Sequence, residues 1–176
     1  NTGIIDIQNE VLSSFNFNDE LKKITNQLFL PGELLVKLNF DIQMSNIEFN
    51  LKDAIISDIA LNFGIGDGTI KLNNYNKNSE CKTLDIDLGM GALYIKNVGN
   101  LICNSMKFKA GLGSLKIEFS KEIIQNIDID IIVGMGSATL IIPKPINATI
   151  IYKPNLFANT NFDGMVLIDN NTYRNE

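Results

Sequence analysis

Apolar residues occupy every second position along five stretches of the chain. In one stretch, Leu84, Ile86 and Leu88 are separated by single aspartates. A period of two is typical of a strand with one buried face. The other four stretches show the same alternation, at Leu38, Phe40 and Ile42; at Ile59, Leu61 and Phe63; at Met106, Phe108 and Ala110; and at Ile129, Ile131 and Val133. The pattern predicts five equivalent half-buried strands.

Each stretch is followed by one version of a short motif, and alternation resumes after it. The versions are QMSNIEFNL from Gln43, GIGDGTIKL from Gly64, GMGALYIKN from Gly89, GLGSLKIEF from Gly111 and GMGSATLII from Gly134. Their starts lie about 20–25 residues apart, which is the spacing of solenoid repeats. We therefore interpret the chain as a stack of copies that each bury an apolar face only against their neighbours.

The paired glycines predict a sharp corner between two strands, because glycine permits a tight bend or a positive φ. We expect the large apolar residue between them to point inward with the other Met and Phe residues of the core. The expected inward residues are Met44, Ile65, Met90, Leu112 and Met135. The expected corner residues are Gly64, Gly66, Gly89, Gly91, Gly111, Gly113, Gly134 and Gly136.

The predicted fold is all-β: a single-stranded parallel β-helix, or β-solenoid, of about five rungs, with neighbouring strands about 4.8 Å apart. Outward positions agree with this stacking, because opposite charges fall side by side in successive copies. These charges are Asp85, Lys107 and Asp130 in one row, Asp87 and Lys109 in a second, and Lys96 and Glu118 in a third. Such rows favour one register over a slipped one.

Two cysteines, Cys81 and Cys103, lie eight residues before their respective glycines. They are expected at the same place in adjacent rungs, with Cα atoms roughly 5 Å apart, which lies inside the disulfide window. The sequence leaves two alternatives open: a stacked pair of half-buried thiols, or a disulfide, which would imply an oxidising compartment.

We divide the single domain into three segments: an N-terminal capping segment at 1–31, the solenoid repeats at 32–144, and a C-terminal strand and loop cap at 145–176. Residues 18–29 predict a short N-capped helix, although 28–38 is also compatible with a strand. Pro143 and Pro145 interrupt the repeat, and the tail is expected as irregular strands over the last rung. The polar return segment 73–82 is expected on the surface.

The composition of this 176-residue chain excludes several classes of function. It has no His, which excludes Ser–His–Asp and Cys–His catalysis and every His-containing metal site. A net charge of −5 with Arg174 as the one arginine argues against nucleic-acid binding. No stretch has the roughly 18–20 apolar residues of a membrane span. We expect no catalytic, cofactor-binding or metal-binding residues.

Two local patterns invite other interpretations. GIGDG at 64–68 resembles half of a dinucleotide-binding fingerprint, but its GxG occurs four times in the chain with strands on both sides, so we interpret it as a corner. Asp85, Asp87, Asp128 and Asp130 could suggest a calcium cage or a carboxylate pair for sugar chemistry. Because Lys107 falls between Asp85 and Asp130, we favour a solvated ladder of charges.

The repeat resembles the bacterial toast-rack domain families. It is also similar to the C-terminal domain of LiaF-type cell-envelope stress proteins and to adhesin-like families of that shape. The resemblance covers about 32–143 and lies in the recurring GxG corner, the NLKDA step at 50–54 and the closing LIIPK at 140–144. It implies a non-enzymatic domain attached to, or working beside, a bacterial envelope, with no family catalytic residue to transfer.

Three functions are compatible with these features. The first is a non-catalytic interaction or scaffold domain of a bacterial cell-envelope or surface protein, with a protein partner or a second copy as its ligand. Membrane attachment would then occur only through a segment outside this chain. The alternatives are a regulatory domain of a membrane-bound envelope-stress protein, and a carbohydrate-binding or lyase-type β-helix.

Overall fold

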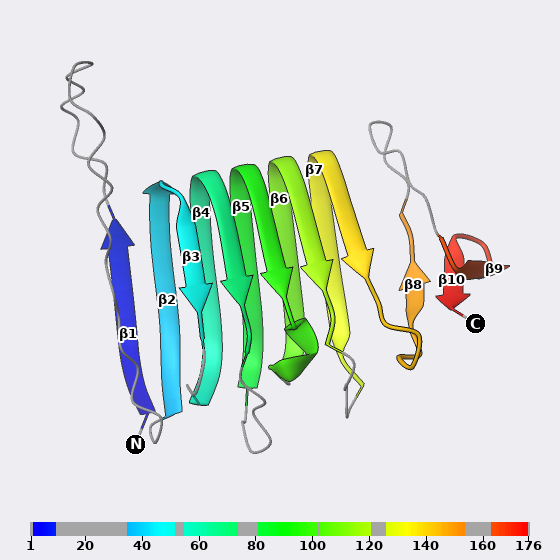
Figure 1. Ribbon diagram of the computed structural model, residues 1–176, viewed down its shortest axis with the longest axis horizontal. Helices are drawn as coiled ribbons and strands as arrows, with labels where there is room; N and C mark the ends of the chain where they lie inside the picture. Colours follow the sequence, from blue (N-terminus) through cyan, green and yellow to red (C-terminus); the bar gives the residue numbers. More distant parts are fainter. Residues whose placement is uncertain are drawn as a thin grey trace.

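The computed structural model describes residues 2–9, 35–51, 55–73, 81–101, 103–120, 126–153 and 163–175, and for 2–9 it describes the backbone. These residues form ten strands and one short 3₁₀ helix, as Figure 1 shows. The elements are β1 (Thr2–Asn9), β2 (Leu35–Met44), β3 (Ile47–Asn50), β4 (Ile55–Lys71), β5 (Cys81–Lys96), η1 (Val98–Asn100), β6 (Cys103–Glu118), β7 (Asp128–Ile141), β8 (Thr149–Ile151), β9 (Met165–Asp169) and β10 (Thr172–Asn175).

The main sheet is a parallel β-solenoid, which confirms the predicted fold class. Its strands follow the order β1-β2-β4-β5-β6-β7, and β3 pairs with β4. Strands β4 to β7 each rise, bend over an arch and descend, so that the arches stand side by side (Figure 1). We call the residues before each GxG the ascending limb and those after it the descending limb; β2 and β3 form the same pair of limbs in the first rung.

The register between rungs is the predicted one. Ile86 pairs with Leu61 of the preceding rung and with Phe108 of the following one. Phe108 in turn pairs with Ile131 of β7. One irregularity falls between Val36 and Lys37 of β2, opposite the extra residue Ser57 of β4. The Ser57 hydroxyl donates a 3.3 Å hydrogen bond to the Val36 carbonyl, which satisfies this buried polar group.

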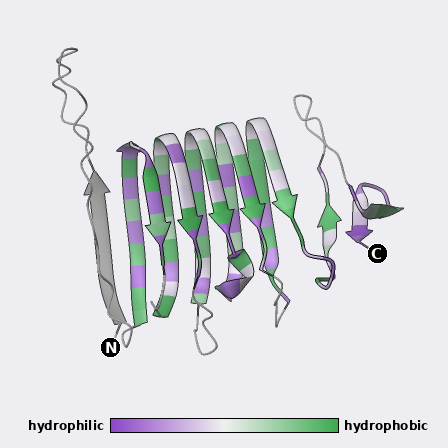
Figure 2. Cartoon of the chain, viewed as in Figure 1, coloured by the Kyte–Doolittle hydropathy of each residue, from purple (hydrophilic) through white to green (hydrophobic). Residues whose placement is uncertain are grey.

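The core lies between the ascending and descending limbs. The rings of Phe40 and Phe49, from the two limbs of the first rung, lie with centroids 4.5 Å apart. Green and purple bands alternate along the limbs in Figure 2, as expected for strands with one buried face. The most deeply buried large side chains are Leu38, Ile56, Leu61, Phe63, Leu84, Ile86, Leu88, Leu93, Ile95, Met106, Phe108 and Leu115.

The N-terminal segment contributes a strand that the sequence analysis did not predict. β1 pairs in parallel with β2, and its Ile5 and Ile7 share a register with Leu38 and Phe40. The alternation of these two isoleucines was the available signal, but it is short and no GxG follows it. The helix expected at 18–29 lies outside the described residues.

The C-terminal tail forms strands, but these strands pair with one another. β8, β10 and β9 make a separate antiparallel sheet, and the path of the solenoid strands ends at β7. The isoleucines Ile142 and Ile146 of the connecting segment pack against the core, whereas Ile129 and Ile131 of β7 stay only half-buried. The division of the chain at residues 31 and 144 stays a prediction, and most of the return segment at 73–82 lies outside the described residues.

Candidate functional site

The corner glycines stack in columns, as predicted. Gly66, Gly91, Gly113 and Gly136 pair in successive rungs, and all four have φ between +130° and +147°. A Cβ atom on any of them would lie 1.7–1.9 Å from a carbonyl oxygen of the preceding rung. The first glycines of the motifs meet the same obstacle at 2.4–2.8 Å; they are Gly64, Gly89, Gly111 and Gly134. Glycine is therefore required for the close approach of the backbones as well as for the bend.

The first rung lacks the paired glycines of the later rungs. Gln43 and Ser45 stand where those rungs have glycine. Each of the glycines that follow is crowded by the rung on its N-terminal side. Gly64 and Gly66 of the second rung lie against the backbones of Gln43 and Ser45.

The apolar residue between the glycines points outward, so the expected inward position was wrong. Met44, Ile65, Met90, Leu112 and Met135 pair in one continuous row. Their exposed fractions run from 37 % for Leu112 to 54 % for Met135. The chain bends around the core here, so residues on the outside of the bend face solvent. We call this row the arch ridge.

The two cysteines form a disulfide. Cys81 and Cys103 pair at the start of the ascending limbs of β5 and β6, and their Cα atoms lie 4.4 Å apart. Both residues are buried. Of the two alternatives left open by the sequence, the structure contains the disulfide, and it covalently joins adjacent rungs.

The first two predicted rows of outer charges are in register. Lys109 and Asp87 form an ion pair at 3.4 Å, and Lys107 lies between Asp85 and Asp130 in register. These groups lie on an open face, so each pair contributes little to stability. Within the described part of the chain, no three His, Cys, Asp or Glu side chains are grouped closely enough to hold a metal ion.

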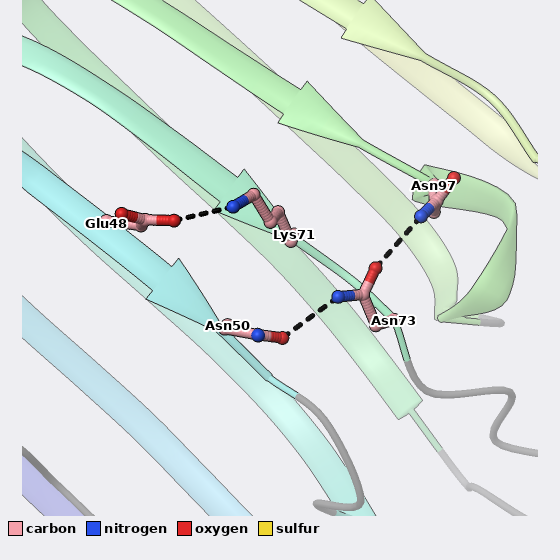
Figure 3. A network of polar contacts seen from close by, with 5 residues as sticks. All are labelled: Glu48, Asn50, Lys71, Asn73 and Asn97. Atoms are coloured by element: carbon pink, nitrogen blue, oxygen red, sulfur yellow. Dashed lines mark hydrogen bonds and ion pairs between the residues drawn. The ribbon is translucent and has the colours of Figure 1, made fainter.

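The descending limbs carry a polar ladder that the sequence analysis missed. The Asn73 amide nitrogen donates to the Asn50 side-chain oxygen at 3.0 Å, and Asn97 donates to Asn73 at 3.1 Å. Figure 3 shows this chain of amides beside the ion pair between Glu48 and Lys71. The available signal was spacing, because the three asparagines lie 23 and 24 residues apart, as the repeats do.

Replacing Asn73 by alanine should remove both bonds of this ladder. We expect a loss of about 1–2 kcal/mol in the free energy of unfolding, since each hydrogen bond contributes about 0.5–1.5 kcal/mol net. Chemical denaturation would measure it. Asn62→Ala, at an exposed outer position of β4, is the matched control and should change stability by less than about 0.5 kcal/mol. Equal losses in the two variants would show that the ladder does not stabilise the stack.

A shallow hollow on the descending limbs surrounds Tyr94; its lining includes Asn46, Asp67, Ala92, Ser114 and Lys116. The Tyr94 hydroxyl donates a hydrogen bond to the Glu118 carboxylate. This bond raises the pKa of Tyr94, with smaller contributions from desolvation and from the negative charge of Glu118.

Two lysine side chains also make cation–π contacts with the Tyr94 ring. The ammonium groups of Lys96 and Lys116 lie 4.5 and 4.6 Å from its centroid. Because these lysines already contact the ring, the hollow offers no open aromatic platform on which a sugar could stack. This arrangement weighs against the carbohydrate-binding alternative.

The GIGDG pattern lies within the single strand β4, whose backbone continues as a strand after Gly68. A dinucleotide site needs a helix that begins at the glycine loop. The corner interpretation therefore fits the structure. No helix in the described residues is both long and apolar enough to cross a membrane.

Comparison with known proteins gives one family. Residues 1–96, more than half of the chain, match the model described as the N-terminal domain of toast_rack, DUF2154. Searches of curated proteins and of solved structures found no match. The matched region covers β1 to β5, so it includes the first three rungs and two of the four GxG corners. The chain therefore belongs to the toast-rack N-terminal domain family.

Proposed function

We propose that this chain is a non-catalytic interaction domain of a bacterial cell-envelope or surface protein, and that it binds a protein partner through the arch ridge. The observation that carries the proposal is the exposed row of large apolar side chains, continuous from Met44 to Met135. Contiguous apolar surface of this kind marks interaction sites on soluble domains. Methionine suits such a surface because its flexible side chain adapts to the partner.

The scaffold beneath the ridge supports this role. Four of the five ridge residues are followed by a glycine whose backbone is packed against the preceding rung, so this part of the row is held in a fixed geometry. A preformed surface loses little conformational entropy when a partner binds. The charged side chains lie on open faces, which favours recognition over catalysis; Asp87 and Lys109 are examples.

The disulfide supports a location on the oxidising side of the envelope. Disulfides persist in secreted and surface proteins and are rare where cytosolic reductants act. The bond between Cys81 and Cys103 is buried within the stack, as expected for a structural cross-link. We therefore place the domain outside the cytoplasm in this proposal.

Site-specific photocrosslinking in intact cells tests the proposal. A photoreactive amino acid at Met90 should give discrete crosslinked protein bands, because Met90 lies in the middle of the ridge. The matched control is Asp85, which is exposed on the same strand but belongs to a charged row. Crosslinks at Met90 and none at Asp85 are expected. Equal labelling at both positions, or no crosslink at Met90, would contradict the proposal.

A further inference from the structure

The last rung differs from the others on its outer surface. Lys109 of β6 pairs with Asp87 on one side and with Ile132 of β7 on the other, and Ile132 is 47 % exposed. Glu118 of β6 pairs with Ile141 of β7, which is 40 % exposed. Two outer charges of β6, Lys109 and Glu118, are thus replaced on β7 by isoleucines, whose apolar side chains are stabilised when they are covered. The other outer residues of β7 stay polar, for example Asp128, Asp130 and Thr139.

The same rung also ends the sheet. β7 pairs with β6 and, among the described residues, with no other strand. Its inner row is half-buried, whereas the matching row of β6 is almost completely buried; compare Ile131 with Phe108. An unpaired strand edge beside apolar surface is a template for adding another strand. Both the backbone and the side chains of β7 therefore offer a surface for strand addition.

We propose that a second copy of this chain docks on β7, edge to edge and antiparallel, about a two-fold axis that runs along the strands. The ascending limb of each β7 then lies beside the descending limb of its partner. A two-fold contact uses the same surface on both copies and closes after two. It would extend the sheet and leave no new open edge at this end.

Charge favours this arrangement over head-to-tail stacking. If β7 of one copy were followed by β1 of the next, Asp130 would face Asp6, because both lie in the same register row. Like charges directly opposite destabilise a strand pair. In the antiparallel pair, Asp130 would face Thr139.

The remaining positions of the antiparallel pair are also compatible. With Asp130 opposite Thr139, the alternation of the strands places Asp128 opposite Ile141 and Ile132 opposite Ser137 on the outer surface. On the inner surface it places Ile129 opposite Leu140, so the two half-buried inner rows meet. Every carboxylate of β7 thus faces an uncharged residue of the partner.

The C-terminal sheet sets one condition on the dimer. β8, β9 and β10 pair with one another, and residues 142–148 connect them to the end of β7. This sheet has to lie clear of the β7 edge when the second copy docks. Ile142 and Ile146 of the connecting segment pack against the core, so they have to leave it when the sheet moves, and Leu140 and Ile129 of the second copy take their place. Seven extended residues span roughly 23 Å, which is long enough for this displacement.

Sedimentation equilibrium of the full chain tests the proposal. We expect a monomer–dimer equilibrium, weakened at least tenfold by I132K/I141E, which gives β7 the outer charges of Lys109 and Glu118. I132K removes an apolar cross-strand contact and I141E sets a like charge opposite Asp128, and both changes destabilise the strand pair. The matched control L112K adds a charge to the arch ridge and should leave dimerisation unchanged. A chain that stays monomeric, or a dimer that L112K abolishes and the double variant does not, would overturn it.

Cysteine crosslinking gives an independent measurement in case I132K/I141E does not fold. D130C/T139C should form a covalent dimer under mild oxidation, because these positions face each other across the two-fold axis. D85C/Y94C places cysteines at the same two rows of β5, inside the stack, and should stay monomeric. Equal crosslinking of the two variants, or none in D130C/T139C, would contradict the antiparallel contact. The ridge crosslinking at Met90 is unaffected by either outcome.

Discussion

Replacing Gly113 by alanine is expected to destabilise the solenoid by about 3–5 kcal/mol, a large part of the 5–15 kcal/mol that stabilises a typical domain. The new Cβ would lie 1.9 Å from the carbonyl oxygen of Gly91, at a backbone φ of +147°. Backbone strain of this kind costs about 1–3 kcal/mol, and forced repacking costs a similar amount. Thermal melting followed by circular dichroism should show a drop of about 10 °C or more.

Gly164 provides the matched control for this substitution. It also has a positive φ, +71°, but no heavy atom lies within 4 Å of where its Cβ would be. Gly164→Ala should therefore cost only the backbone strain, about 1–2 kcal/mol. If both variants lost the same stability, the close approach of the rungs at Gly113 would not be what requires glycine.

Removing the disulfide is expected to have the second-largest effect. Cys81 and Cys103 are separated by 22 residues. The loop-closure estimate for a ring of this size is about 3 kcal/mol. The variant Cys81→Ala/Cys103→Ala should lose this amount in chemical denaturation and should keep its strand content.

Reductant separates the cross-link from the packing of the side chains. Melting the wild-type protein with reductant should bring it close to the double variant, and the double variant itself should not respond. Mass spectrometry after alkylation under denaturing conditions without reductant should find no modified cysteine. Two alkylated thiols in protein purified under oxidising conditions would show that the rungs are not cross-linked.

The stacking of the rungs could be predicted from sequence because every copy repeats the same constraint. The alternation at Leu84, Ile86 and Leu88 fixes which face is buried, and the recurring GxG fixes the register between copies. A slip of one residue would turn each inner row to solvent. The sequence therefore specifies the column of Gly66, Gly91, Gly113 and Gly136 without reference to any other protein.

The outward direction of the ridge could not be predicted by the same argument. Strict alternation applies to an extended strand, whereas Met90 lies between Gly89 and Gly91, where φ reaches +130° and the chain turns. The identity of a large apolar residue at such a bend does not show whether its side chain points inward or outward. The oxidation state of Cys81 and Cys103 also lay outside the sequence pattern, which placed the two residues together but left the bond open.

The two ends of the stack were the least predictable parts. The recurring motif carries the signal, and β1 lacks it, so the strand that pairs with β2 was missed.

The polar ladder through Asn73 was overlooked for a different reason. Its residues occupy neighbouring, non-identical positions of the repeat, and amides at strand ends usually indicate turns.

Nuclear Overhauser contacts between the corner glycines test the stacking of rungs most directly. In a selectively labelled sample, the backbone protons of Gly91 should show contacts to those of both Gly66 and Gly113, and Gly113 should show contacts to Gly136. These contacts follow from parallel strands in exact register. Contacts of Gly91 with residues displaced along β6, or contacts that run in the antiparallel sense, would contradict the solenoid and the surfaces derived from it.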